Sequence, residues 1–266
     1  MTGLNAALVG LGAILTAQTL VWIVSVRRRD ASIADICWGL GFVLLAGIYV
    51  YLSPAPTLRA WLATALITLW GVRLSLHIFL RHRGQGEDPR YQAMRASHGA
   101  GFWRRSLFSV FWLQGAILWF VALPLFVAER AASPAALTPV DGLGVLLFMI
   151  GFGFEVVGDY QLARFRADPG NRGHVLDRGL WRYTRHPNYF GDATLWWGIY
   201  AIAVSTPGGW LTVLSPSLMM LLLMRISGVT LLENRLKTSK RGYHAYISRT
   251  PAFFPRFPHL RSPSVF

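Results

Sequence analysis

Residues 4–26, with the sequence LNAALVGLGAILTAQTLVWIVSV, form an uncharged stretch that is followed at once by Arg27-Arg28-Arg29. A bilayer core of roughly 30 Å takes about 20 apolar residues as a helix, so this stretch is long enough to cross a membrane. A secretory signal would have basic residues before its apolar run, whereas here they come after it. We therefore expect a retained membrane span whose N-terminus lies outside.

The composition of the whole chain points to the same environment. Of 266 residues, 53% are hydrophobic and only 14% are charged, and the mean hydropathy is +0.40. Such a chain is too apolar for an ordinary soluble domain. The formal net charge of +14 is expected to reflect membrane topology and not a nucleic-acid partner. The single cysteine, Cys37, excludes an internal disulfide and a cysteine-cluster metal site, and no metal is expected.

Further apolar stretches approach the length of a span, and the charges between them predict a topology. The predicted spans are residues 4–26, 33–52, 61–80, 107–127, 143–162, 189–204 and 210–226. Lys and Arg fall mainly in alternate connections, at residues 27–29, 81–105 and 164–185 and in the tail from 235, while the other connections hold only Arg59 and Arg130. Positive charge marks the cytoplasmic side. We predict one all-α membrane domain of seven transmembrane helices, N-terminus outside and C-terminus cytoplasmic.

The stretch Arg182-Tyr183-Thr184-Arg185-His186-Pro187-Asn188-Tyr189-Phe190-Gly191-Asp192 reads as the start of a helix. Proline is tolerated in a first helical turn, which places the helix start at Pro187. Guanidinium groups and the free N–H groups of a helix start both bind phosphate. An anionic ligand is therefore expected, with Asn188 and Asp192 facing its neutral groups. The alternative is that the arginines only follow the positive-inside rule and bind lipid head groups.

Acidic residues inside or at the edges of spans are costly and are functional candidates. They are Asp35, Glu155, Asp159, Asp192 and Glu233. On a helix, Glu155, Asp159 and Arg166 fall close to one stripe. They either line a polar cleft or form a buried ion pair that fixes helix packing.

The first half of the chain carries a smaller set of candidates. Arg73 and His77 lie four residues apart on the third predicted span, and Tyr91 follows in the next connection. Two ionisable groups on one face of a membrane helix raise the expectation of function. Asp35 is either an anchor for helix packing or part of a substrate pocket.

Several motifs in the C-terminal half resemble one known family. They are Asp159-Tyr160-Gln161-Leu162 with Arg166, then residues 179–192 from Gly179-Leu180-Trp181 through Asp192, then Leu231-Leu232-Glu233 with Tyr243, Tyr246 and Phe253-Phe254-Pro255. From about Gly151 onward the chain is similar to the steroid 5α-reductase-like membrane reductases, and within them to a bacterial branch of unassigned function. The resemblance implies seven spans, a place in the bacterial inner membrane, and NADPH bound from the cytoplasmic side.

The resemblance also divides the chain by role. It implies that residues 151–266 bind the cofactor and that residues 1–150 serve the substrate. The candidate cofactor-binding residues are Glu155, Asp159, Arg166, Arg178, Arg182, Tyr183, Arg185, His186, Asn188, Tyr189, Asp192, Glu233 and Tyr246. Steroid reductases of this family grip the substrate carbonyl with a glutamine–glutamate pair and a tyrosine in early spans. That set is not found by motif here, and Asp35, His77 and Tyr91 are the available catalytic substitutes.

Three functional hypotheses follow. The first is NADPH-dependent reduction of a carbon–carbon double bond conjugated to a carbonyl, in a lipophilic, steroid-like or lipid substrate. The second is an S-adenosylmethionine-dependent methyltransferase of the isoprenylcysteine carboxyl or phospholipid type, because those enzymes share the Arg-His-Pro-x-Tyr-x-Gly pattern. They tend to carry paired glutamates near the last span, whereas here Asn234 follows Glu233. The third is a non-catalytic lipid-binding or scaffold protein.

Overall fold

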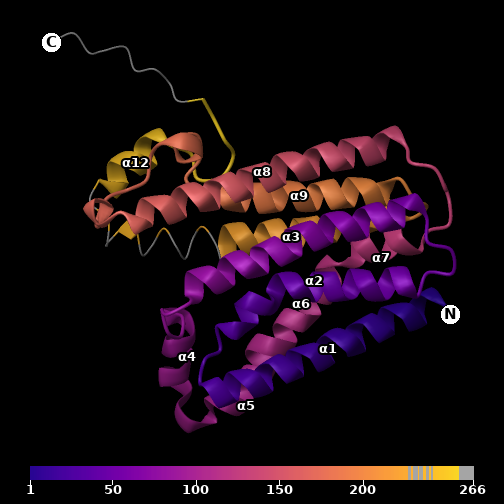
Figure 1. Cartoon of the computed structure of the whole chain (residues 1–266), viewed down its shortest axis with the longest axis horizontal. Helices are drawn as coiled ribbons and strands as arrows, with labels where there is room; N and C mark the ends of the chain where they lie inside the picture. The colour runs from indigo at the N-terminus through magenta and orange to yellow at the C-terminus, as the bar shows by residue number, and fades with distance from the viewer. Residues whose placement is uncertain (227–228, 230–232, 234–235, 238–239, 241, 258–266) are drawn as a thin grey trace. The chain divides into compact units, whose positions relative to one another are not determined.

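The computed structural model describes residues 1–226, 229, 233, 236–237, 240 and 242–257. These residues form helices joined by turns, with no β-strand among them (Figure 1). The chain divides into two compact units. Unit 1 comprises Met1–Gly142 with Tyr200–Ser215, and unit 2 comprises Leu143–Ile199 with Pro216–Phe266.

Unit 1 is built on long apolar helices, two of which begin at a threonine cap. The helices are α1 (Gly3–Arg28), α2 (Ile33–Tyr51) and α3 (Leu58–His82), followed by α4 (Pro89–His98), α5 (Phe102–Ser106), α6 (Leu113–Val121) and α7 (Leu123–Arg130). The Thr2 hydroxyl accepts a hydrogen bond from the Asn5 N–H, and Thr57 caps α3 in the same way. Arg29 ends α1 in the left-handed conformation, with φ of 53°.

Unit 2 contains most of α8 (Pro139–Ala167) and α9 (Pro187–Val204), part of α10 (Leu214–Leu221), and α12 (Tyr243–Arg249). The helix start predicted at Pro187 is confirmed. Leu231, Leu232 and Asn234, which contributed to the sequence motifs, lie outside the described residues.

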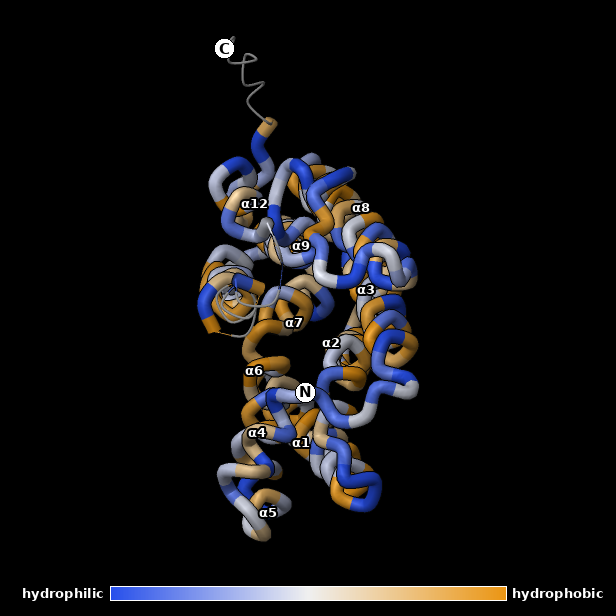
Figure 2. Tube along the Cα trace, turned by 90° about the vertical axis from the view of Figure 1, so that its left-hand side faces the viewer, coloured by the Kyte–Doolittle hydropathy of each residue, from blue (hydrophilic) through white to orange (hydrophobic). Residues whose placement is uncertain are grey.

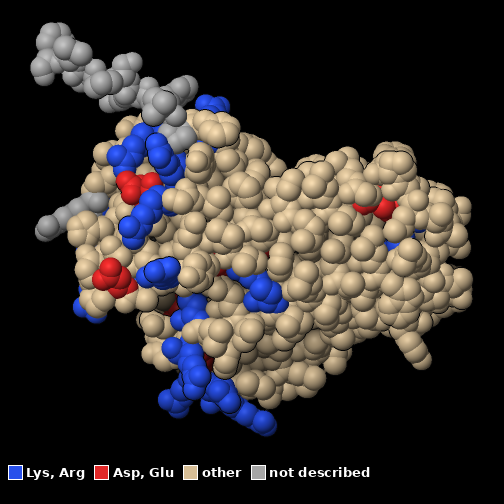
Figure 3. All heavy atoms as spheres, turned by 45° about the horizontal axis from the view of Figure 1, so that its top comes forward, with Lys and Arg blue, Asp and Glu red and all other residues tan. Residues whose placement is uncertain are grey.

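Five helical stretches of the described chain are long and apolar enough to cross a membrane. They are α1, α2, α3, α8 and the stretch Gly209–Ile226. A sixth span results if Pro89–Val121 and α7, which meet at an angle of 44°, are taken together. Figure 2 shows the hydrophobic runs along α6 and α7, and Figure 3 shows wide areas of surface without charged side chains. The protein is therefore an all-helical, multi-pass membrane protein, while the count of seven and the orientation stay predictions.

The predicted span at residues 107–127 is not one straight helix. Residues Leu107–Trp112 are π-helical, α6 ends at Val121, and α7 restarts at Leu123 with Pro124 in its first turn. Proline lacks an N–H and its ring clashes with the carbonyl four residues earlier, which accounts for the break.

Glycine allows the helices to approach closely within each unit. In unit 1, a Cβ added at Gly39 would lie 2.3 Å from the Gly71 carbonyl oxygen, and one at Gly71 would lie 2.5 Å from that of Gly39. In unit 2, a Cβ at Gly191 would lie 2.4 Å from the Gly151 carbonyl oxygen. In lipid there is little hydrophobic driving force for helices to associate, so they are held together mainly by close van der Waals packing. Small residues at these crossings allow the backbones to come that close.

Arg59, expected in a connection between spans, is instead fully buried in the first turn of α3. Its Nε and Nη2 donate to Asp141 at 2.7 and 2.9 Å, and its remaining N–H groups reach the carbonyls of Pro134 and Ala136. The charge is buried because every side of the guanidinium group has an acceptor.

Candidate functional site

Unit 1 holds a cluster of four polar side chains around Asp35, which we call the Asp35 cluster: Asp35, Arg90, Tyr91 and Gln114. The Tyr91 hydroxyl donates to Asp35 Oδ1 at 2.7 Å, and Arg90 Nη2 donates to Asp35 Oδ2 at 2.6 Å. Gln114 Nε2 donates to the same Oδ1 at 3.3 Å and lies 3.5 Å from the Tyr91 hydroxyl. The carboxylate is thus surrounded by three donors from two other helices, α4 and α6.

Local capping brings α4 to the start of α2. Asp88 caps α4, its side chain accepting from the Arg90 N–H at 2.8 Å, and the Asp88 N–H donates to the Ser32 hydroxyl at 2.7 Å. Glu87 accepts from the Ala31 N–H at 2.8 Å and pairs with Arg95 at 2.8 Å. These bonds place Arg90 and Tyr91 beside Asp35, which lies in the first turn of α2.

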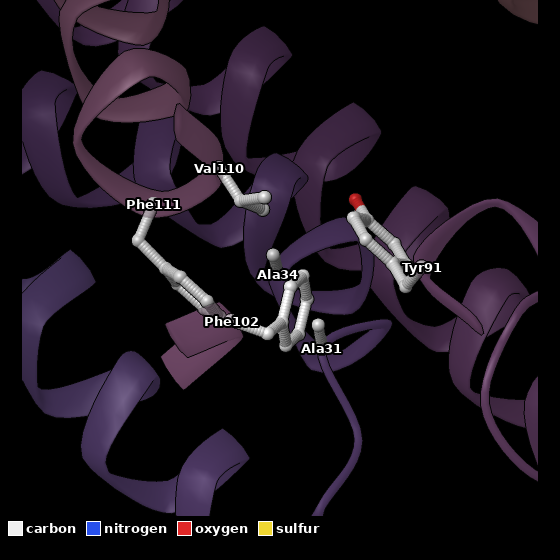
Figure 4. Close-up of a cluster of buried hydrophobic side chains, with 6 residues drawn as sticks. All are labelled: Ala31, Ala34, Tyr91, Phe102, Val110 and Phe111. Carbon is white, nitrogen blue, oxygen red and sulfur yellow. The ribbon is translucent and has the colours of Figure 1, made fainter. Parts of the chain in front are cut away.

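Packing holds the Tyr91 ring in place. The ring belongs to a buried apolar cluster with Ala31, Ala34, Phe102, Val110 and Phe111 (Figure 4). Tyr91 is 6% exposed, whereas the side chains of Asp35 and Arg90 are 23% and 35% exposed. The cluster therefore has a fixed aromatic member and two charged members that solvent or a ligand can reach.

Gln114 has an unused hydrogen-bonding group within the Asp35 cluster. Its Oε1 is buried without a partner among the described residues. Exchanging the amide oxygen and nitrogen would set an oxygen against the Asp35 carboxylate, so the present orientation is the favourable one. A buried acceptor left unpaired costs about 1–3 kcal/mol.

Of the three predicted catalytic residues, the structure brings Asp35 and Tyr91 into direct contact. His77 and Arg73 are half-buried on α3. Arg90 and Gln114 were not predicted as site residues. Arg90 directly precedes Tyr91, which was a usable signal, but Gln114 is a lone glutamine in an apolar run whose partners are 79 and 23 residues away.

Unit 2 holds a second carboxylate-centred cluster, which we call the Glu233 cluster: Arg185, His186 and Glu233. Arg185 Nε and Nη2 donate to the two Glu233 oxygens at 2.8 and 3.2 Å. His186 Nε2 lies 3.1 Å from Glu233 Oε1. The side chains of Arg185, His186 and Glu233 are 9%, 1% and 12% exposed. The arginine and histidine of the sequence motif are therefore paired within the protein.

The remaining donors of Arg185 hold the C-terminal segment. Arg185 Nη1 donates to the carbonyls of Thr250 and Ile247, and its backbone N–H donates to Pro251 at 2.9 Å. The Thr184 hydroxyl donates to the Phe253 carbonyl at 2.8 Å. The Tyr246 hydroxyl donates to the Trp181 carbonyl. Trp181, Thr184 and Arg185 are thus hydrogen-bonded to residues 246–253.

The charges of the Glu233 cluster follow from its burial and partners. Burial raises the pKa of Glu233, but hydrogen bonds and charge from His186 and Arg185 outweigh burial and bring the pKa to about 2. Burial lowers the pKa of His186, and the contact with Glu233 only partly offsets this effect. His186 is therefore neutral at pH 7, with its proton on Nε2 facing the carboxylate and a lone pair on Nδ1. Nδ1 is buried without a partner among the described residues.

Asn188 and Asp159 form a separate pair in unit 2. Asn188 Nδ2 donates to Asp159 Oδ1 at 3.0 Å, and Asn188 Oδ1 accepts from the Tyr189 N–H at 3.1 Å. Glu155 and Asp159 are buried and Asp192 is half-buried. Asp159 of α8 and the predicted amide of α9 therefore meet at the start of α9.

A pocket of about 80 Å³ lies beside the Glu233 cluster in unit 2. Aromatic and aliphatic side chains make most of its wall, with Arg166, Lys240, His174, Arg185 and His186 as the polar lining. Its apolar lining residues are Leu162, Phe165, Val175, Leu176, Trp181, Leu236, Tyr243 and Tyr246.

The other predicted binding residues lie on the surface of unit 2 or beside the pocket. Arg178 is exposed, 6.0 Å from the Phe165 ring, and Arg182 is also exposed. Tyr183 contacts Phe257 edge to face, and Tyr189 stacks on His186 with centroids 5.5 Å apart. Among the described residues, no group of three or more His, Cys, Asp or Glu side chains is placed to hold a metal ion.

Comparison with known proteins now places the chain in a family. The profile of a family described as protein of unknown function (DUF1295) matches residues 21–250. The chain belongs to this family. An uncharacterized protein of Schizosaccharomyces pombe is 26% identical over 280 residues, which cover 95% of this chain and 80% of the yeast protein. No solved structure matches the chain significantly. Both the Asp35 cluster and the Glu233 cluster lie within the residues that the family profile covers.

Proposed function

We propose that this member of the DUF1295 family is an integral-membrane reductase that uses NADPH to saturate a carbon–carbon double bond conjugated to a carbonyl. The substrate is a lipophilic small molecule, and the enzyme belongs to the bacterial inner membrane. The observation that carries the proposal is the Asp35 cluster, in which a tyrosine hydroxyl, an arginine and an amide converge on one partly exposed carboxylate.

The Asp35 cluster has the chemistry that enone reduction requires. Adding hydride to the β-carbon develops negative charge on the carbonyl oxygen, which donors must stabilise before a proton completes the product at the α-carbon. The Arg90 guanidinium is such a donor through Nη1, which takes no part in its bonds to Asp35 and Asp88, and the Tyr91 hydroxyl becomes one when its single hydrogen turns from Asp35 to the substrate oxygen. Asp35 orients both groups, and the buried ring of Tyr91 keeps its hydroxyl in position. Arg90 Nη2 donates to Asp35 at 2.6 Å and so fixes the orientation of that carboxylate.

The residues of unit 2 fit a nucleotide cofactor. Arg166 and Lys240 line the pocket and supply positive charge for phosphate groups. NADPH, when bound, supplies the hydride. The Asn188–Asp159 pair at the start of α9 offers further polar groups for hydroxyls of a ribose.

The test is NADPH oxidation by the purified full-length protein in detergent, followed at 340 nm with a panel of lipophilic enones. We expect turnover by the wild type and a large loss of turnover in Tyr91→Phe, which keeps the packing of the ring and removes only the hydroxyl. Tyr160→Phe is the matched control, because Tyr160 is an exposed tyrosine of α8. If the protein instead transfers a methyl group from S-adenosylmethionine and oxidises no NADPH with any enone, the reductase proposal is rejected.

A further inference from the structure

Two tryptophans of unit 1 join the C-terminal part of α1 to α5. Trp22 Nε1 donates to the Trp103 carbonyl at 2.8 Å, and the two rings stack with centroids 6.2 Å apart. Figure 1 shows α5 beside this end of α1. Arg27–Arg29 follow Trp22 within two helical turns. Arg104 and Arg105 directly follow Trp103. Two groups of arginines that are far apart in the sequence are therefore brought to the same end of unit 1.

These arginines carry positive charge that the protein itself does not neutralise. We call them the α1–α5 arginine patch: Arg27, Arg28, Arg29, Arg104 and Arg105. All are exposed, and within the described part of the chain none of them pairs with a carboxylate. The acidic side chains of residues 1–112 pair with other basic groups: Asp30 with His82, Asp35 and Asp88 with Arg90, and Glu87 with Arg95. The patch therefore suits an anion from outside the chain.

Arg29 belongs to the patch in spite of its backbone conformation. Its φ of 53° lies in the left-handed region, and it is the one residue other than glycine with a positive φ among the described residues. Its N–H makes the hydrogen bonds that end α1. Glycine would make the same bonds without strain and is common at such a position. The end of the helix alone therefore does not call for an arginine here.

Exposed apolar side chains surround the patch. Val24 and Val26 of α1, Trp103 of α5, and Phe108 and Trp112 of the π-helical segment are between 37% and 59% exposed. Trp112 Nε1 donates to the Thr19 hydroxyl of α1 at 3.0 Å, which ties this segment to the same helix. Positive charge next to aromatic rings at the end of a span is typical of the boundary between lipid and water.

We propose that the α1–α5 arginine patch binds the head group of an anionic phospholipid, whose acyl chains lie against the exposed apolar side chains of α1 and Leu107–Trp112. Guanidinium groups match the oxygens of a phosphate in geometry. The Arg104 guanidinium lies over the Trp103 ring, 5.3 Å from its centroid, so the ring covers one face and leaves the N–H groups at the edge for a phosphate.

The chemistry of the surface favours an anionic lipid over two other ligands. A small soluble phosphate compound would use the arginines but would leave the aromatic and aliphatic side chains uncovered. A zwitterionic lipid would use the apolar surface but would bring its own cation to the arginines. Each arginine near an anionic lipid strengthens binding roughly fivefold. The inference involves neither the Asp35 cluster nor unit 2, so it does not depend on the proposed reaction.

The experiment is native mass spectrometry of the purified full-length protein, released from detergent after titration with three probes. They are dioleoylphosphatidylglycerol, dioleoylphosphatidylcholine and glycerol 3-phosphate. We expect phosphatidylglycerol to bind about tenfold more tightly than phosphatidylcholine. Glycerol 3-phosphate, which has the phosphate but no acyl chains, should not bind in the same concentration range. Equal binding of the two lipids would overturn the inference, and so would binding of glycerol 3-phosphate as tight as that of phosphatidylglycerol.

The double variant Arg104→Gln/Arg105→Gln removes two charges from the patch and leaves the arginines next to α1 in place. The preference for phosphatidylglycerol should fall to about twofold or less. Arg172→Gln/Arg256→Gln is the matched control, because it removes two exposed arginines from unit 2, and it should retain the preference. An equal loss in both double variants would show that net charge sets the preference, which would overturn the site.

The inference stays testable if the patch variant does not fold, since the comparison of the three probes uses the wild type alone. It also fails or succeeds separately from the proposed function. Lipid preference without NADPH turnover would support the patch and reject the reductase. NADPH turnover by a protein that binds both lipids equally would support the reductase and reject the patch.

Discussion

The Asp35 cluster and the Glu233 cluster are built from similar parts but leave different groups available. Each has a carboxylate that accepts from an arginine and from one further ring-bearing side chain, at distances between 2.6 and 3.2 Å. Around Glu233, the arginine is 9% exposed and its donors are used within the protein. Around Asp35, the arginine is 35% exposed. Each cluster has one buried acceptor without a partner among the described residues, Gln114 Oε1 beside Asp35 and His186 Nδ1 beside Glu233.

This difference shows that a dense polar motif and a ligand-facing site are not the same thing. The stretch from Arg182 to Asp192 is the most crowded polar segment of the chain, yet Arg185 serves mainly to hold Glu233 and the C-terminal segment. Asp35 and Tyr91 are 56 residues apart and make no motif, yet they meet in a cluster that solvent reaches. We expect variants of the Glu233 cluster to change stability first, and variants of the Asp35 cluster to change activity first.

The largest effect is expected from Arg185→Met. It leaves the buried Glu233 carboxylate without its cation and frees the carbonyls of Thr250 and Ile247, which should lower the free energy of unfolding by about 3–5 kcal/mol. This loss of unfolding free energy is measured by thermal and denaturant unfolding in detergent. Arg90→Met is the matched change in the Asp35 cluster, and because Arg90 is more exposed it should cost about 1 kcal/mol or less. Equal losses in both variants would contradict the contrast between the clusters.

Acidification should destabilise the protein through the Glu233 cluster. The pKa of Glu233 falls from 4.5 to about 2 on folding, so its contribution is complete above pH 4.5 and is lost as the pH falls toward 2. This lowering of the Glu233 pKa contributes about 3 kcal/mol to the free energy of unfolding at neutral pH. The lowered pKa of His186 acts in the same direction, because the unfolded chain takes up that proton first as the pH drops below about 6.5. In Glu233→Gln the unfolding free energy should depend less on pH between 5 and 3. If the unfolding free energy of Glu233→Gln depends on pH as strongly as that of the wild type, the ion pair of Glu233 does not stabilise the fold.

Asp35→Asn should lower kcat by about a hundredfold in the NADPH-dependent assay while the unfolding midpoint changes little. The amide keeps the size of the side chain but no longer orients Arg90 and the Tyr91 hydroxyl as a carboxylate does. Asp168→Asn provides the control, since Asp168 is an exposed carboxylate that caps the turn at Pro169–Asn171. A large loss of stability in Asp35→Asn with kcat unchanged would assign Asp35 to helix packing.

The smallest effect on stability is expected from Gln114→Leu. This change removes a long hydrogen bond to Asp35 together with the unpaired buried Oε1, so the unfolding free energy should change by less than about 1 kcal/mol. Activity should fall, because the Asp35 cluster loses its amide. Ser109→Ala changes an exposed hydroxyl of the same broken helix and should affect neither quantity. If Gln114→Leu has the same kinetics as the wild type, Gln114 is not part of the active site.

The membrane class and most helix positions are predictable because they depend on local sequence. Predicted residues 4–26, 33–52 and 61–80 fall within α1, α2 with its C-cap, and α3. The break at residues 107–127 follows from Pro124 and from the change of helical type before Leu113, which a count of apolar residues does not register. Glu129 is buried on α7 and accepts a hydrogen bond from the Thr64 hydroxyl at 2.9 Å, and it too belongs to no sequence motif.

The sequence by itself determined that the chain is an all-helical membrane protein, that a helix starts at Pro187, and that Asp35, Tyr91, His186 and Glu233 are worth attention. Hydropathy, proline and the high cost of charge in lipid are properties of short stretches, so they can be read without the fold. Only the tertiary structure decided that Arg185 faces Glu233, that Gln114 joins Asp35, and that His186 retains an unpaired nitrogen. These outcomes depend on which side chains meet across helices, and spacing along the chain does not encode them.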